Sequence, residues 1–177
     1  MDTRLAFLSA LLAVGILVSG CFDEVGGPYD GPDRIAFATE GGTFRTTVPD
    51  DAGSIELPVQ LIGPQRSESF EVNVGIQRDT SFRERVDEAP DGSDTTIVDV
   101  RALPTTAESG NYTIPDSFTF PDDTSNVDFE VDINDAFSSS APADTSTRVT
   151  LRLEPNSDAN IEVAENWRYF EVNIANN

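Results

Sequence analysis

Hydrophobic and polar residues alternate along most of the chain after residue 33. The alternation is clearest in SIELPVQLI, where Ile55, Leu57, Val59 and Leu61 occupy every second position. Because successive side chains of a β-strand point to opposite faces, this pattern predicts a strand with one buried and one solvated face. Pro58 interrupts the run and cannot donate a backbone hydrogen bond, which predicts a sheet edge or a bulge there.

Eight further segments show the same period of two. Four of them are Phe70–Ile76, Val127–Ile133, Val149–Leu153 and Phe170–Ile174, and the shorter candidates are Ile35–Phe37, Thr43–Val48, Thr95–Val100 and Ser117–Phe120. No segment shows the period of an amphipathic helix. Two polar stretches are predicted to be loops, the charged Arg78–Ser93 and the Ser/Ala/Asp-rich Ser138–Thr147. Short strands separated by Gly, Pro and Asp predict a single all-β sandwich or barrel of about seven to nine strands.

The first residues have a different character. Arg4 precedes an apolar run, Leu5–Val18, which is shorter than the roughly 20 residues of a membrane span and is typical of a secretory signal. The following LVSGC, which ends at Cys21, resembles the lipobox of bacterial lipoproteins. The resemblance implies cleavage before Cys21 and acylation of this cysteine, for example with palmitate, and several acyl chains anchor a protein stably. An ordinary signal peptide with a chance cysteine and a short anchor helix remain as alternatives.

These features divide the chain into three parts. Residues 1–20 are predicted to be a lipoprotein signal peptide, residues 21–32 an acylated flexible tether rich in Gly and Pro, and residues 33–177 the β-sandwich domain. Asp23 and Glu24 resemble the acidic export signal of surface lipoproteins in the Bacteroidota group. We therefore expect a lipid-anchored protein of the cell envelope at the outer membrane. The sequence does not distinguish the periplasmic from the extracellular side of that membrane.

The charge of the chain limits its partners. The formal net charge is −21, and all 11 basic residues are arginine. An acidic domain lacks the basic footprint that nucleic-acid binding requires. An excess of carboxylates without lysine resembles the proteins of salt-accumulating halophiles, in which salt screens self-repulsion. Cation binding is the other interpretation of this charge, while 38% hydrophobic residues argue against disorder.

Residues 107–153 carry a recognisable pattern. The residues that match it are Ala107, Gly110, Asn111, Tyr112, Phe120, Pro121, Asn134, Asp135, Leu151 and Leu153. This pattern resembles Calx-beta-like domains and related domains of unknown function in Bacteroidota surface lipoproteins. The resemblance implies an immunoglobulin-like Greek-key sandwich, which the segment from Ile35 to Ile76 fits more loosely.

The same resemblance suggests a calcium site. Calx-beta domains hold calcium with acidic loop residues at one end, and calcium takes six to eight oxygen ligands. Asp135 matches an aspartate of the family, but the glutamates that usually follow are missing and only Asp144 stands in that loop. The candidate calcium ligands are Asp122, Asp123, Asp132, Asp135 and Asp144. Turn formation is the alternative role of these residues.

Most catalytic chemistry is excluded by composition. Without histidine or lysine there is no Ser-His-Asp triad, no ordinary zinc site and no Schiff base. A carboxylate pair of the glycosidase type remains an unfavoured alternative. Trp167 and Tyr169 are predicted to pack at the end of the sandwich, with stacking on a sugar or a partner as the other interpretation. The sequence therefore predicts a non-enzymatic adhesion or binding module, without a cofactor, for an envelope protein or an extracellular glycan.

Overall fold

The computed structural model describes residues 31–39, 44–88, 92 and 94–176. The chain divides into two compact units, Met1–Gly31 and Pro32–Asn177, and the fold described below is that of the second unit. Cys21, the predicted signal peptide and all but the last two residues of the predicted tether lie outside the described residues. No helix in the described part of the chain is long and apolar enough to cross a membrane.

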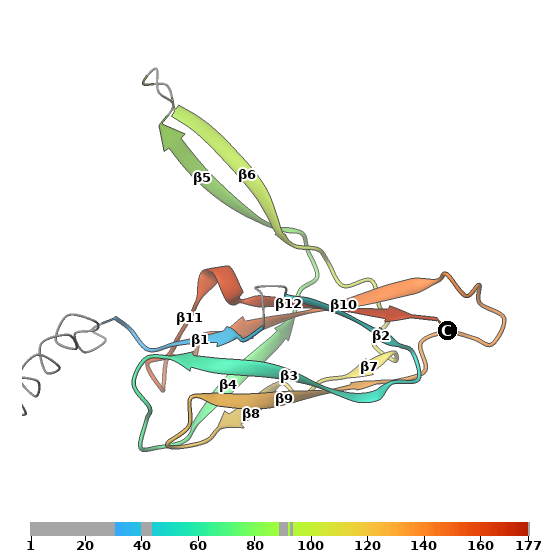
Figure 1. Ribbon diagram of the computed structural model, residues 1–177, viewed down its shortest axis with the longest axis horizontal. Coiled ribbons are helices and arrows are strands. Elements are labelled where there is room, and N and C mark those ends of the chain that lie inside the picture. The colour runs from blue at the N-terminus through green and yellow to red at the C-terminus, as the bar shows by residue number, and fades with distance from the viewer. Residues whose placement is uncertain (1–30, 40–43, 89–91, 93, 177) are drawn as a thin grey trace, which may run out of the picture. The chain divides into compact units, whose positions relative to one another are not determined.

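Two five-stranded sheets form the body of the second unit (Figure 1). The first sheet has the order β11 (Glu162–Val163), β1 (Arg34–Phe37), β3 (Gly53–Ile62), β9 (Asn126–Ile133) and β7 (Tyr112–Thr113). The second sheet has the order β2 (Arg45–Pro49), β12 (Tyr169–Ala175), β10 (Ser146–Glu154), β4 (Phe70–Ile76) and β8 (Ser117–Phe120). Most neighbours are antiparallel, while β1 pairs with β11 and β2 pairs with β12 in parallel. The only helical segment in the described residues is the short 3-10 helix η2 (Glu165–Trp167).

The apolar residues that alternate along the strands fill the space between the two sheets. Phe37 of the first sheet meets Phe170 of the second with ring centroids 5.5 Å apart, and Phe118 meets Phe129 at 5.0 Å. Phe120 stacks on Phe70 at 5.0 Å. The largest fully buried side chains are Phe37, Phe120, Phe129, Ile35, Leu151, Leu153, Ile174, Val59, Val72, Val131, Val149 and Val172. Burial of these side chains is the main favourable contribution to folding.

The predicted all-β sandwich is confirmed: eight of the nine segments predicted from period-two alternation lie within strands, and the ninth, Thr43–Val48, overlaps β2 from Arg45 onward. The structure has twelve strands in its described residues, more than the expected seven to nine. Two of the additional strands, β7 and β11, contain only two residues each. Segments this short carry no readable period, because alternation needs at least four positions.

The prediction that Arg78–Ser93 forms a loop is wrong for half of the segment. Ser81–Glu88 forms β5, which pairs with β6 (Asp94–Ala102) in a separate two-stranded sheet. The strand was missed because only Phe82 and Val86 of its eight residues are apolar. The segment therefore lacks the run of alternating apolar positions that reveals the other strands.

Pro58 does not lie in an edge strand, since β3 is flanked by β1 and β9. However, β1 pairs with β3 only as far as Phe37, which lies opposite Val59. The carbonyl of Pro58 accepts a hydrogen bond from the Ala38 amide at 2.8 Å, just beyond the end of β1. Proline is tolerated here because the missing donor faces the place where the neighbouring strand has ended.

Candidate functional site

A two-stranded arm extends from the second unit (Figure 1). The arm consists of β5 and β6, which pair only with each other among the described residues. A bulge at its root places Arg101 between the pairs Ser81–Ala102 and Phe82–Val100. Both outer edges of the arm keep backbone groups available, and a hairpin of two strands is at best marginally stable in water by itself.

One face of the arm is apolar and open to solvent. Phe82 pairs with Val100, and Glu84 pairs with Val98, so these four side chains share a face. Phe82 and Val100 are each 56% exposed and Val98 is 53% exposed. Trp167 is the only other large hydrophobic residue reported as exposed in the described part of the chain. Monomeric soluble proteins seldom expose a cluster of large apolar side chains. Such clusters are therefore typical of interaction surfaces.

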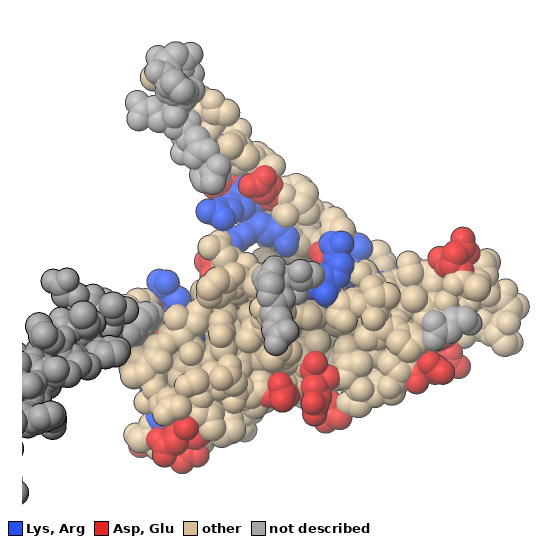
Figure 2. All heavy atoms as spheres, viewed as in Figure 1, with Lys and Arg blue, Asp and Glu red and all other residues tan. Residues whose placement is uncertain are grey.

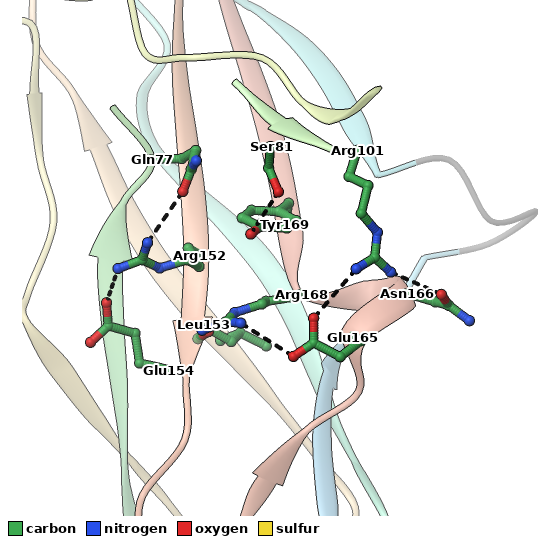
Figure 3. Close-up of polar contacts among 10 residues, drawn as sticks. All are labelled: Gln77, Ser81, Arg101, Arg152, Leu153, Glu154, Glu165, Asn166, Arg168 and Tyr169. Carbon is green, nitrogen blue, oxygen red and sulfur yellow. Dashed lines mark hydrogen bonds and ion pairs between the residues drawn. The ribbon is translucent and has the colours of Figure 1, made fainter. Parts of the chain in front are cut away.

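The opposite face of the arm is polar and is bound to η2 (Figure 3). Arg101 donates to Asn166 Oδ1 at 2.9 Å and pairs with Glu165 Oε2 at 3.3 Å. Arg83 donates to the same Asn166 oxygen at 3.4 Å. At the root, the Ser81 hydroxyl donates to the Tyr169 hydroxyl oxygen at 3.1 Å. These bonds hold one face of the arm toward the sandwich and leave the apolar face outward.

The segment that leaves the arm is also fixed to the second sheet. The Leu103 amide donates to Glu171 Oε1 at 3.0 Å, and Arg45 pairs with Glu171 Oε2 at 2.6 Å. The amide of Thr150 donates to Thr105 Oγ1 at 2.9 Å. Glu171 is 7% exposed and is a charged group that would be costly to bury without these partners. The root of the arm is therefore defined by several bonds and not by a flexible hinge.

A cleft of about 660 Å³ lies at the end of the sandwich beside η2. We call it the Trp167 cleft, after the tryptophan that lines it together with Arg34, Glu162, Glu165, Asn166 and Arg168. Trp167 is 40% exposed and belongs neither to the core nor to the partly buried side chains packed against it. Trp167 therefore lies at the end of the sandwich, as predicted, but it is more exposed than a residue that caps the core. The three-residue η2 buries no residue, so it presents its side chains instead of anchoring them.

The charged side chains of the Trp167 cleft form pairs. Arg34 Nε lies 3.2 Å from Glu162 Oε2, and Arg168 Nη1 lies 3.2 Å from Glu165 Oε1. Glu165 therefore bridges the cleft to the arm, because its other oxygen binds Arg101 (Figure 3). Figure 2 shows arginine atoms gathered where the arm meets the sandwich, with some carboxylates beside them and others along the rest of the visible face. In a chain of net charge −21, this region is locally balanced.

The five aspartates predicted as calcium ligands are all exposed, and they are divided between distant places. Asp122 and Asp123 follow β8, before β9 begins, whereas Asp132 and Asp135 lie at the far end of β9. At about 3.3 Å per residue, β9 separates these two groups by roughly 20 Å. Asp144 lies in the loop that leads to β10.

No group of three or more His, Cys, Asp or Glu side chains in the described part of the chain is placed to hold a metal ion. Asp123 has a φ of 51° and its amide donates to the Arg66 carbonyl at 2.7 Å, which fits a turn residue. The calcium site stays a prediction to which the positions of these five residues add no support. Lipidation of Cys21 also stays a prediction, because Cys21 lies outside the described residues.

The Trp167 cleft holds two carboxylates, which bears on the glycosidase alternative. Glu162 and Glu165 are both engaged in ion pairs with arginines. Glycosidases require one carboxyl group that donates a proton to the leaving oxygen. Both carboxylates are already bound by guanidinium groups, so this cleft adds no support to the glycosidase alternative.

Sequence reasoning missed the arm as a unit. TTIVDV was recognised as a strand, but Phe82 was assigned to a loop and Arg101 was not singled out. A usable signal was present in the dipeptide Asp91-Gly92, because Asp-Gly between two apolar runs is a strong hairpin indicator. Gly92 has a φ of 80°, a conformation that favours glycine. Glu165 and Asn166 carried no signal in sequence, since their role depends on partners more than 60 residues away.

Comparison with known proteins yields similarity in fold only. No protein-family model matches this sequence, and no curated protein matches it. Among solved structures, the apo-form Calx CBD1 domain shares 15% identity with a TM-score of 0.47, over 83% of this chain and 99% of that domain. The Calx CBD2 domain shares 11% identity with a TM-score of 0.43, over 80% of this chain and 85% of that domain. The periplasmic chaperone SfaE shares 13% identity with a TM-score of 0.39, over 81% of this chain and 57% of that chain.

Proposed function

We propose that this protein is a lipid-anchored binding module of the cell envelope that docks onto a partner protein through the apolar face of its arm. The observation that carries the proposal is the exposure of Phe82, Val98 and Val100, each more than half open to solvent on one face of a two-stranded hairpin. A two-stranded hairpin becomes stable when a third strand pairs with it or when its apolar face is covered. A partner protein can do either, by adding a strand to a free edge or by packing against the apolar face.

The partner is a different protein and not a second copy of this chain. Two copies would each carry a formal charge of −21, so their approach is opposed by an electrostatic repulsion that salt reduces and that a neutral or basic partner avoids at any salt concentration. A partner surface with apolar side chains and a neutral or basic rim would meet no such barrier. The exposed Glu84 beside Val98 favours a basic or hydrogen-bonding group at that position of the partner.

A photoreactive amino acid placed at position 98 or 99 tests this surface. Val98 and Asp99 are neighbours in β6, both are exposed, and they lie on opposite faces of the arm. On intact envelopes we expect one discrete adduct from position 98 and none from position 99. The protein in the adduct is then purified and titrated, and Val98→Ser should weaken binding at least tenfold while Asp99→Ser leaves it unchanged. Equal adducts from both positions, no adduct, or an adduct of two copies of this chain would contradict the proposal.

The membrane anchor is tested through Cys21, the only cysteine of the chain. Cys21→Ser should move the protein from the membrane fraction to the soluble or unprocessed fraction, because the thiol is the attachment point of the first lipid. Asp23→Asn is the control, since it leaves the LVSGC motif intact and should stay in the membrane fraction. Unchanged membrane partitioning of Cys21→Ser, measured by fractionation and mass spectrometry, would show that the anchoring proposal is wrong.

The environment that fits this chain is a concentrated salt solution at the outer membrane. Support comes from composition alone, namely 32 acidic residues, 11 arginines and no lysine. At high ionic strength the repulsion among these carboxylates is screened, and their hydration keeps the surface soluble. The dependence of stability on salt, considered in the Discussion, tests this part of the proposal.

A further inference from the structure

A second binding site lies in the Trp167 cleft, away from the apolar face of the arm. We infer that the Trp167 cleft binds an uncharged carbohydrate, which stacks on Trp167 and hydrogen-bonds to the paired charged side chains around it. This inference does not rest on the arm or on the lipid anchor. It rests on the volume of the cleft, the exposure of its aromatic residue and the balance of its charges.

The size of the cleft fits a small ligand. Its volume of about 660 Å³ lies within the range of roughly 300–1,000 Å³ that is usual for ligand pockets. Such a space admits a short chain of sugar units and is too small to accommodate a folded protein. Its walls are formed by η2 and its flanking residues, by β11, by the start of β1, by the end of β3 and by Pro155 after β10.

Trp167 provides a flat apolar surface at this site. It is the only tryptophan in the chain, and it is 40% exposed although an indole ring gains much from burial. Within the described residues its only reported hydrogen bond is from its backbone amide to the Ala164 carbonyl, at 2.8 Å. The indole N–H is therefore available to a ligand, and the ring can stack on the C–H face of a sugar.

The charges of the cleft select an uncharged ligand. Two arginines and two glutamates line it, and their formal charges cancel. Each of them is already paired, Arg34 with Glu162 and Arg168 with Glu165. An ionic ligand would meet charges that are already neutralised by their partners, whereas a hydroxyl group needs only the donors and acceptors that remain.

Spare hydrogen-bonding capacity remains after this pairing. A guanidinium has five N–H donors and a carboxylate has about four acceptor sites, so each pair can serve several sugar hydroxyls as well. Asn166 accepts from Arg101 and Arg83 with its side-chain oxygen, which leaves its amide donors for a ligand. The cleft thus combines an aromatic surface with donors and acceptors, the two requirements for recognition of an uncharged polyol.

Intrinsic fluorescence reports directly on this cleft, because Trp167 is the sole tryptophan. The probes are maltotetraose, cellotetraose and mannotetraose, with an oligogalacturonate as the charged comparison, all in high salt. We expect a saturable change in emission with at least one uncharged oligosaccharide and none with the oligogalacturonate. Calorimetry then measures the affinity of the protein for the uncharged oligosaccharide that gave the fluorescence change. We expect at least a tenfold loss of this affinity in Trp167→Ala, a smaller loss in Trp167→Phe and a loss in Glu162→Gln.

The matched control is Glu130→Gln, which makes the same change as Glu162→Gln at an exposed carboxylate of β9 that does not line the cleft, and it should bind the sugar normally. Circular dichroism verifies that each variant is folded. The inference is overturned by the absence of saturable binding with all three uncharged probes, by equal affinity of Trp167→Ala and the unchanged protein, or by preference for the charged probe. None of these results affects the docking proposal for the arm, which is measured at positions 98 and 99.

Discussion

Phe120→Ala should lower the free energy of unfolding by about 3–5 kcal/mol, the usual cost of removing a buried phenylalanine. Phe120 is 0% exposed, and its ring stacks on Phe70 with centroids 5.0 Å apart. Removal of this ring leaves a cavity beside Phe70, and the cost includes both the lost burial and the cavity that the neighbours do not fill. Since small domains have only about 5–15 kcal/mol of stability, this loss is a large part of the total.

The control for this prediction is Phe82→Ala on the arm. The same side chain is removed, but Phe82 is 56% exposed, so the cost should be less than about 1 kcal/mol. Both variants are measured by urea denaturation in high salt, with the unchanged protein alongside. Equal losses in the two variants would show that the arm is part of the stabilising core, and would remove the reason for treating its apolar face as a free surface.

Transfer from about 1 M to about 0.01 M salt should lower the free energy of unfolding by several kcal/mol, because the Debye length grows from about 3 Å to about 30 Å. Two like charges 10 Å apart repel with about 0.4 kcal/mol in water, and folding brings many such pairs together. Among the described residues only five carboxylates take part in ion pairs, those of Asp33, Glu154, Glu162, Glu165 and Glu171. The remaining carboxylates are therefore screened mainly by salt.

The measurement is the thermal unfolding midpoint at a series of sodium chloride concentrations. A second series in sodium sulfate at matched ionic strength separates screening from salting-out, since sulfate also strengthens hydrophobic burial. A midpoint that rises steeply up to molar salt in both series supports the brine proposal. An unfolding midpoint that does not depend on salt would contradict it and leave the acidic composition to be explained by cation binding.

The sandwich was readable from sequence because its strands have one buried face. In β3, the alternation of Leu57, Val59 and Leu61 with polar residues is a direct record of the core that they enter. In the arm, β6 was readable in this way but β5 was not, because only two of its eight residues are apolar. Phe82 consequently looked like one apolar residue in a charged loop.

The binding features were harder still to predict, since they depend on which distant residues meet. Trp167 was noticed as an aromatic candidate, yet its exposure follows from η2, a helix too short to leave a periodic signal. Glu165 gained its position from Arg101, 64 residues earlier. Charge pattern indicated an acidic chain but gave no indication that its arginines gather beside the arm. The predicted aspartates failed to converge because β9 holds two groups of them apart.

Ser81 and Ala102 are paired directly across the base of the arm. The two points at which the arm joins the sandwich are therefore only one strand spacing apart. Any hairpin that begins and ends on such a pair can be exchanged there, or replaced by a tight turn, without repacking the core. Specificity and stability are then encoded in different stretches of the gene, and the recognition segment is free to diversify while the scaffold that carries it stays the same.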